Sequence, residues 1–542
     1  MGSVAASLTS LETFHPGGAE PTSRANITLS GTASGEGWHD AAFVFCVVLA
    51  YASFLAAGMA RHELWRDEAQ AWLIVRDAGS LRELIHLLSY EGHPALWYLL
   101  LRPLTYVTHS PTAMQALHGV IATAAVCVFV RFSPFTRTQK VLWCFGYYSL
   151  FEYGIISRNY SLGVLLLWTL CALWPRRRQV VIAMAIVLAL LINANVFAAL
   201  IAAAFAAVWL GDAWSRRRDS ASADASMRTW PRPAFALLIL IAASAFCLWT
   251  VYPAEDSLIR PAVTRGNEAG ETRAFLKHAA RCFADIWQSN VPLPDLTTQN
   301  FWNSNVLRID TRMGLVAALV LSGAILISAV WTLRRSRAAV AIYLVATTLL
   351  VTGTTVLLPD AMRHVGHLAL AFIACAWVAR LEAPPDSIGG PPSGSLLTVL
   401  LAAQFLAAMY AITVDLRRPF SSGDEAARWL RENALADAAI VGDVAHRYSP
   451  LVARLDTRIY YPVRRAWGSY ALLDRTNKDA TPQEVGDACR SLLREGRPVI
   501  LITTRTLADP PGDLRYEPLA AFTGSVTRES YHLYRVWPAQ DR

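Results

Sequence analysis

Apolar runs of nearly membrane-spanning length recur through this sequence and constrain its fold more than any other feature. A helix needs about 20 mostly apolar residues to cross a bilayer. Hydrophobic residues make up 54% of the chain, and eleven runs approach the required length. The sequence therefore predicts a polytopic α-helical membrane protein with about eleven spans, at residues 41–59, 94–108, 113–132, 141–156, 162–174, 180–210, 233–252, 314–333, 338–358, 364–379 and 395–414.

Arginine clusters orient these spans. The basic loops 214–232 and 334–337 should face the cytoplasm under the positive-inside rule. Loops 60–93 and 253–312 and the chain after residue 414 then lie outside. Residues 1–40 lack a basic start followed by an apolar core, so we expect a disordered cytoplasmic tail and not a cleaved signal. The same clusters account for the net charge of +8, so this charge does not indicate that the protein binds nucleic acid.

Two topologies remain open between residues 94 and 210. If each run crosses once, the basic loop 175–179 faces outward, against the charge rule. Alternatively, the long run 180–210 is a hairpin with its tip at Asn193 and Asn195, and the runs from 94 to 132 together make one crossing. The second arrangement places 175–179 inside and 157–160 outside.

The chain after residue 414 has a different composition. An amphipathic helical pattern (DEAARWLREN) is followed by two short strand patterns (DAAIVGD and RPVILITTR), which predicts an extracytoplasmic α/β domain over residues 415–542. The turn at Gly442 and Asp443 resembles a nucleotide fold only faintly, because no glycine-rich fingerprint follows. A disulfide between Cys282 and Cys489 is conceivable, but no spacing supports it.

The outer loop and the start of the next run, Trp65 to Leu101, hold the first candidate site. Asp67 and Glu68 should lie near the outer membrane interface, where a carboxylate could act as a general base or could simply be solvated. LRELIHLL has the spacing of an interfacial amphipathic helix. Glu91 and His93 precede Pro94, where His93 either binds substrate or caps a helix.

Cationic and aromatic residues near other span ends are the second group of candidates. Arg363 and His364 follow an outer-facing span end, where a guanidinium suits a phosphate group. Arg158 and Tyr160 interrupt two apolar runs and are further candidates. A divalent metal site is possible in principle, but the spacing of its candidate ligands supports none strongly; these are Asp67, His93, His364 and His367.

Together, these motifs resemble membrane glycosyltransferases of the GT-C superfamily, in the group related to protein mannosyltransferases and lipid A aminoarabinose transferase. WRDEAQAW matches the acidic first outer loop, and YEGHPALWYLLL matches the HPP-like start of the second span, with Ala95 in place of the second proline. Arg363 and His364 are similar to a late Arg-aromatic motif, with His in place of Tyr or Phe. The resemblance covers residues 41–380.

The resemblance implies an inverting sugar transfer from a polyprenyl-phosphate donor to a hydroxyl of a glycan, lipid or protein acceptor, at the outer face of the plasma membrane. Asp67 would be the catalytic base. The substrate-binding residues would be Glu68, Glu91, His93, Arg158, Tyr160, Arg363 and His364. The alternative is a transporter or polysaccharide-export component, which should have inverted repeats and broken helices.

Overall fold

The computed structural model describes residues 33–219, 231–259, 269–298, 300–357, 361–383, 393–507 and 513–539. Its contacts divide the chain into residues 1–45 and 46–542. Helix α1 (Ala33–Arg61) begins inside the tail that was predicted to be disordered, and the rest of that tail, residues 1–32, lies outside the described part. The contacts that position the site all lie within residues 46–542.

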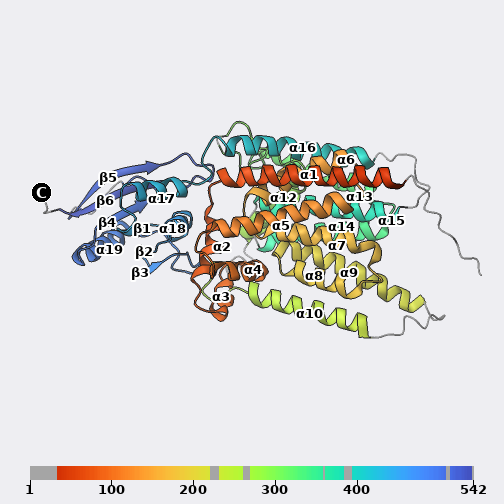
Figure 1. The fold of residues 1–542 in the computed structure, drawn as a ribbon, viewed down its shortest axis with the longest axis horizontal. Helices are drawn as coiled ribbons and strands as arrows, with labels where there is room; N and C mark the ends of the chain where they lie inside the picture. Colours follow the sequence, from red (N-terminus) through yellow and green to blue (C-terminus); the bar gives the residue numbers. More distant parts are fainter. Residues whose placement is uncertain are drawn as a thin grey trace, which may run out of the picture. The chain divides into compact units, whose positions relative to one another are not determined.

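A bundle of helices forms the larger part of the molecule (Figure 1). Within the described ranges, eight helices are long and apolar enough to cross a membrane. These are α1 and α5 (Thr112–Phe132), α9 (Val196–Asp219), α10 (Pro231–Val251), α13 (Arg312–Leu333), α14 (Arg337–Leu357), α15 (Met362–Glu382) and α16 (Ser393–Asp415). Shorter apolar segments complete the bundle, namely α7 (Tyr160–Leu173), α8 (Val181–Ile192) and the broken pair α6 (Arg137–Cys144) and π-helix η1 (Tyr147–Ile155).

The predicted span at residues 94–108 is wrong. Helix α4 (Leu96–Thr105) has 10 residues, which extend about 15 Å and cover only half of a bilayer's hydrocarbon core. The long run 180–210 instead forms two helices, α8 and α9, separated at Asn193–Asn195. Asn195 Oδ1 accepts the Ala198 amide hydrogen at 2.8 Å and so caps the start of α9.

Two different sets of contacts distinguish the two ends of the bundle. The basic turn after α7 contacts the ends of α9 and α15, where Arg177 lies 3.8 Å from Asp212 and 2.9 Å from Glu382. The turn before α7 contacts the loop after α1 at the other end, where Arg158 lies 2.7 Å from Asp67. These contacts agree with the hairpin arrangement, because it is the one that places loop 157–160 at the same end of the bundle as the loop after α1.

Helix α15 lies at the centre of the bundle. It is apolar enough to cross a membrane, yet nearly all of it is buried inside the protein. At Gly366 a Cβ atom would stand 2.3 Å from a ring carbon of Tyr148, so only glycine permits this close approach to η1. This packing fixes the first turn of α15, which carries Arg363.

The loops at the Asp67 end contain three helices of their own. Helices α2 (Arg66–Asp77) and α3 (Leu81–Leu88) follow α1, and the predicted interfacial helix corresponds to α3, with His86 exposed. Loop 253–312 contains α12 (Ala269–Asn290), which packs against α13 and α15. Helix α12 was not predicted, although Ala279, Cys282 and Ile286 recur at helical spacing.

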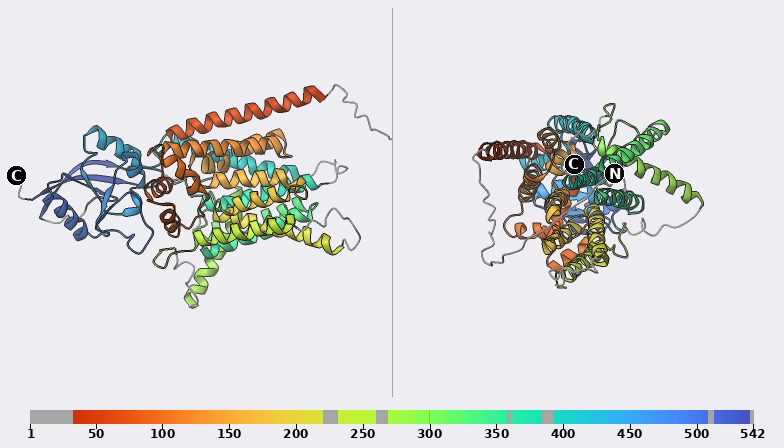
Figure 2. Two further views of the ribbon diagram at one scale, coloured as in Figure 1. Left: turned by 60° about the horizontal axis from the view of Figure 1, so that its bottom comes forward. Right: turned by 90° about the vertical axis from the view of Figure 1, so that its right-hand side faces the viewer.

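The C-terminal region is an α/β domain, as predicted. Its six-stranded mixed sheet has the order β3-β2-β1-β4-β6-β5. The strands are β1 (Ala439–Gly442), β2 (Ile459–Tyr461), β3 (Ala466–Gly468), β4 (Val499–Thr503), β5 (Leu514–Phe522) and β6 (Tyr531–Pro538). Helices α17 (Gly423–Glu432) and α18 (Ser449–Leu455) cover one face, and α19 (Pro482–Arg494) covers the other. Figure 2 shows this domain beyond the end of the bundle that carries α2, which α18 contacts.

Asp443 and Cys489 both have structural roles in this domain. The Asp443 carboxylate accepts hydrogen bonds from Tyr448 and from the Thr504 amide at 3.1 Å, so it holds β1 to the end of β4. Cys489 is buried against β1 and β4 and forms no disulfide with Cys282.

Candidate active site

Asp67 lies in the first turn of α2, where unpaired backbone N–H groups favour a negative charge. At the start of this helix the Glu68 carboxylate accepts the Trp65 amide hydrogen at 2.9 Å, which satisfies the backbone N–H of the N-cap residue. The side chain of Asp67 is 31% exposed. The position that was predicted to hold a base is thus accessible and rigidly placed.

Two guanidinium groups converge on Asp67 from other elements. Arg158 Nη1 lies 2.7 Å and Arg363 Nη2 lies 3.6 Å from Asp67 Oδ2. Burial by itself raises the pKa of Asp67, but the charges of Arg158 and Arg363 outweigh it and hold this pKa below its usual range. Asp67 is therefore ionised at neutral pH.

His93 contacts this ion pair through Arg158. Arg158 Nη2 donates to His93 Nε2 at 3.2 Å. Burial and the charge of Arg158 lower the pKa of His93 to about 3, so its ring is neutral and carries its proton on Nδ1. The turn before Pro94 uses Gly92 at a φ of 67°, a backbone conformation that glycine adopts readily.

The pKa of Glu91 is shifted in the opposite direction to that of Asp67. Gln70 Nε2 donates to Glu91 Oε1 at 3.1 Å. Burial, reinforced by the charge of Asp67, nevertheless raises the pKa of Glu91 to about 7. Two neighbouring carboxyl groups whose pKa values are moved apart are typical of sites that exchange protons.

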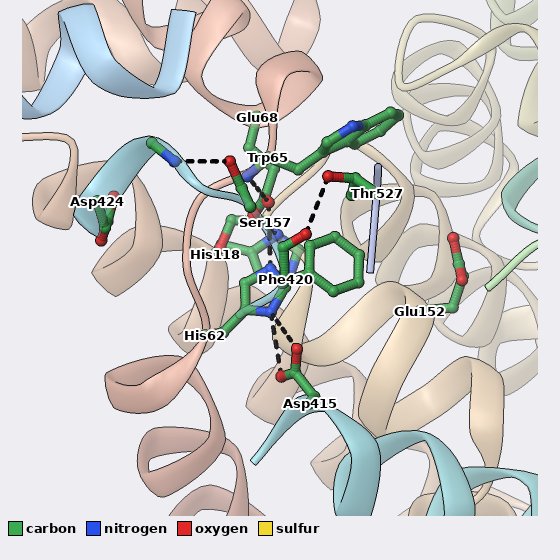
Figure 3. Close-up of polar contacts among 12 residues, drawn as sticks. His62, Trp65, Glu68, His118, Glu152, Ser157, Asp415, Phe420, Asp424 and Thr527 are labelled. Atoms are coloured by element: carbon green, nitrogen blue, oxygen red, sulfur yellow. Dashed lines mark hydrogen bonds and ion pairs between the residues drawn. The ribbon is translucent and has the colours of Figure 1, made fainter. Parts of the chain in front are cut away.

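Glu68 is not positioned to touch a substrate. Its side chain is completely buried, and its Oε2 lies 3.3 Å from His62 Nε2. Its Oε1 accepts the Ser157 amide hydrogen at 2.6 Å. His62 Nδ1 lies 3.2 Å from Asp415 at the end of α16, so a buried cation stands between two carboxylates (Figure 3). We therefore correct the substrate-binding role expected for Glu68 to a positioning role.

This buried cluster joins the segments that carry the exposed site. Ser157 directly precedes Arg158, and Glu68 directly follows Asp67. Burial lowers the pKa of His62, but Asp415 and Glu68 outweigh it and raise this pKa to about 10. The ring is thus an imidazolium that neutralises part of the buried negative charge. No sequence pattern marked His62, because it lies alone at the end of an apolar run.

His364 and Tyr160, the two remaining predicted residues, both make contacts through their rings. The His364 ring stacks on Phe197 with centroids 4.7 Å apart. Tyr160 is 1% exposed, and its ring lies 5.6 Å from the Arg158 guanidinium carbon. The four proposed metal ligands are not gathered as a site, and no group of three or more His, Cys, Asp or Glu side chains suitable for a metal occurs in the ranges that the structure describes.

A cavity of about 430 Å³ opens beside Asp67. Both Arg66 and Arg363, which lie 3.6 Å from the Asp67 carboxylate, line it. Trp65 and Trp302 form its aromatic wall, and the Arg363 guanidinium lies 4.9 Å from the Trp65 ring. Arg528 of the C-terminal domain also lines it. Three guanidinium groups at one cavity suit an anion.

Arg66, Arg528 and Trp302 were not predicted as site residues. Arg66 adjoins Asp67 and could have been included on that ground. Arg528 lies in a turn far along the chain, in a domain that was left without a role, and no local pattern marks it.

The C-terminal domain also packs directly on α2. Ala69 and Leu73 on α2 belong to the same buried cluster as residues of α17, α18 and the sheet. The Gln70 side chain binds both the carbonyl and the amide of Ala471, and Ser449 Oγ donates to Gln70 Oε1 at 3.2 Å. The helix that carries Asp67 is thus held between the bundle and this domain.

Comparison with solved structures identifies the fold. The apo-state crystal structure of ArnT from Cupriavidus metallidurans matches with a TM-score of 0.50 and 11% sequence identity, over 92% of this chain and 98% of that chain. The chain has the GT-C fold. The structure of the same ArnT bound to undecaprenyl phosphate matches with a TM-score of 0.49 and 12% identity, over 93% of this chain and 98% of that chain.

The GT-C fold includes both parts of the molecule, because the match extends over nearly the whole chain. No protein-family model and no curated protein sequence matches this chain. At this low identity the likeness establishes the fold, and the activity must be argued from the residues.

Proposed function

We propose that this protein is an inverting glycosyltransferase that moves a sugar from a polyprenyl-phosphate donor to an acceptor hydroxyl at the outer face of the membrane. The observation that carries the proposal is the convergence of a partly exposed Asp67 carboxylate with Arg158 and with Arg363, which also lines the arginine-lined cavity. In a GT-C fold, this arrangement provides both a proton acceptor and a binding site for a phosphate.

The reaction would be a single displacement. The Asp67 carboxylate takes the proton of the acceptor hydroxyl as its oxygen forms a bond to the anomeric carbon of the sugar. The bond from that carbon to the phosphate oxygen breaks on the opposite face, so the configuration inverts. The polyprenyl phosphate leaves with one additional negative charge, which the guanidinium groups of Arg66, Arg363 and Arg528 stabilise.

The ion pairs of Asp67 offer a way to couple donor binding to catalysis. With the cavity empty, Arg158 and Arg363 hold the pKa of Asp67 low, which makes it a weak base. A donor phosphate at Arg363 would compete for that guanidinium and add negative charge nearby. Both effects raise the pKa of Asp67, so the base becomes stronger once the donor has bound.

Glu91 and His93 would then recognise the sugar or acceptor hydroxyls. The neutral His93 ring has Nδ1–H available as a donor, since its Nε2 accepts from Arg158. A carboxyl with a pKa of about 7, such as Glu91, is able to donate or accept a hydrogen bond near neutral pH. Arg158 holds both Asp67 and His93 in place.

The decisive experiment incubates purified protein with a panel of radiolabelled polyprenyl-phosphate sugars and membrane extract. Wild type should transfer label, and Asp67→Asn should insert normally but lose about 10²- to 10⁴-fold of the rate, as expected for a missing general base. Asp437→Asn, at an exposed position in the C-terminal domain, is the matched control and should keep full activity. Full transfer by a well-folded Asp67→Asn protein would refute this mechanism.

The transporter interpretation remains as the competing outcome of this test. The break between α8 and α9 at Asn193–Asn195 is the feature that it predicted. That break forms the tip of a hairpin and contributes no residue to the arginine-lined cavity. If neither protein transfers label but wild type moves a labelled glycan across a sealed vesicle, the transporter interpretation is correct.

A further inference from the structure

A second cavity lies between α1 and α5, apart from the arginine-lined cavity. Its volume is about 1040 Å³. Small side chains on both helices leave this space open, and its walls include Ala52, Ala56 and Met59 of α1 and Ala116, Gly119 and Ala124 of α5. We call it the α1–α5 groove. No step of the proposed reaction uses it.

The walls of the groove place it within the membrane. Both helices are long and apolar enough to cross a membrane. Phe54 and Val120 are 63% and 68% exposed on the same two helices, as expected for surfaces that face lipid. Water is a poor filler for an apolar space of this size, so a lipid chain is the suitable occupant. A lipid tail gains little by moving from one apolar medium to another, and any selectivity must therefore come from its headgroup.

The polar end of the groove lies where α1 ends, beside α17 and α18. Two of the cations there are already neutralised. Arg454 Nε lies 2.9 Å from Asp424 Oδ1, and His62 stands between Glu68 and Asp415. These groups stabilise the protein and leave little charge for a ligand.

Two other arginines at the same end are not neutralised. Arg61 and Arg428 line the groove and are exposed, and neither has an ion-pair or hydrogen-bond partner among the residues that the structure describes. Glu63 is the remaining carboxyl group in the lining. Burial, together with the charges of Asp424 and Glu425, raises the pKa of Glu63 to about 8, so near neutral pH it is mostly protonated and able to donate a hydrogen bond.

We propose that the α1–α5 groove binds an anionic phospholipid of the surrounding bilayer. An acyl chain lies along the small residues of α1 and α5, and the headgroup phosphate binds Arg61 and Arg428. The charges match, because two uncompensated guanidinium groups meet an anionic headgroup at the end of an apolar channel.

The bound headgroup would lie close to the catalytic helix. Glu63 is four residues before Asp67, and four residues span at most about 14 Å. His62 lines the groove and also contacts Glu68. A lipid at this end therefore restrains the segment from which α2 begins, while taking no part in sugar transfer. The lipid site does not depend on the proposed function.

Native mass spectrometry of the full-length purified protein tests the proposal directly. The protein is titrated with phosphatidylglycerol and, separately, with phosphatidylcholine of the same acyl chains. We expect one phosphatidylglycerol to bind on the order of tenfold more tightly than phosphatidylcholine, since two arginines contact the headgroup. Equal retention of the two lipids overturns the proposal.

Two kinds of variant separate the headgroup site from the chain site. Arg61→Gln combined with Arg428→Gln should abolish the preference for phosphatidylglycerol. Ala124→Phe should fill the groove and remove the bound lipid. Arg335→Gln, an exposed arginine between α13 and α14, is the control and should change nothing. Unchanged binding by either groove variant, with an unchanged thermal midpoint showing that it is folded, contradicts the assignment.

Discussion

Asp67 Oδ2 and Arg158 Nη1 lie 2.7 Å apart, although one residue follows the first span and the other lies in the turn before α7. This ion pair determines the protonation state of the candidate base. It also joins the start of α2 to the turn before α4, because the same guanidinium donates to His93. Changes to either residue should therefore alter the pH dependence of activity as well as its size.

Replacing Arg158 with Gln should move the acid limb of the pH–rate profile to higher pH. Asp67 must be ionised to accept a proton, and its pKa is held down chiefly by Arg158 and then by Arg363. Without Arg158 the carboxylate protonates at a higher pH, so activity is lost earlier as the pH falls. The measurement is kcat/KM for transfer as a function of pH. Arg335→Gln serves as control, and an unmoved acid limb in Arg158→Gln would show that Asp67 is not the titrating base.

Glu91→Gln should change how the thermal midpoint depends on pH. The pKa of Glu91 is about 7 in the folded protein and about 4.3 in an unfolded chain. A raised carboxyl pKa contributes stability that is fully present below the unfolded pKa and is lost as the pH rises through the folded one. The neutral amide of the variant does not titrate, so the variant does not lose this stability as the pH rises. The thermal midpoint of the variant minus that of wild type should therefore be larger at about pH 8.5 than at about pH 5.5.

The control for Glu91 is Glu495→Gln, an exposed carboxyl at the end of α19. It should follow the wild-type pH dependence throughout. Parallel curves for wild type and Glu91→Gln would mean that Glu91 titrates normally, and its assignment as a hydrogen-bonding partner near neutral pH would lose its basis.

Arg528→Gln tests the part of the donor site that comes from the C-terminal domain. Arg528 lines the cavity with Arg66 and Arg363 but does not pair with Asp67. Loss of one charged contact to a phosphate should raise the KM for the donor about tenfold and leave the KM for the acceptor unchanged. Arg515→Gln on an exposed edge of β5 is the control. An unchanged donor KM in Arg528→Gln removes the C-terminal domain from the donor site.

Prediction from the sequence succeeded where a short segment determines the outcome. The α3 helix depends on the spacing of neighbouring residues, and it was placed correctly. The prediction of a span at 94–108 failed because hydropathy reports how apolar a segment is and not how long its helix is. Pro103 lies within α4 near its end, where a proline disfavours continuation of the helix. The roles of Glu68, His62 and Arg528 depend on contacts between distant segments, which no local pattern records.

The buried cluster of His62, Glu68 and Asp415 should control the catalytic rate without contacting substrate. His62→Asn leaves two buried carboxylates without their cation, a change that costs about 3–5 kcal/mol of unfolding free energy in comparable pairs. Because Glu68 holds the Ser157 amide next to Arg158, the Asp67–Arg158 pair should also loosen. We therefore expect kcat to fall while the donor KM stays near its wild-type value.

A second substitution separates the electrostatic effect of His62 from a simple packing defect. Adding Asp415→Asn to His62→Asn removes one of the uncompensated carboxylates, so the double variant should have a higher thermal midpoint than the sum of the two single effects predicts. His86→Asn, at an exposed position on α3, controls for loss of an imidazole and should behave as wild type. If the His62 charge stabilises the protein by neutralising Asp415, that stabilisation must be smaller when Asp415 is replaced by a neutral residue. Additive effects of the two substitutions would therefore show that His62 acts through its shape alone.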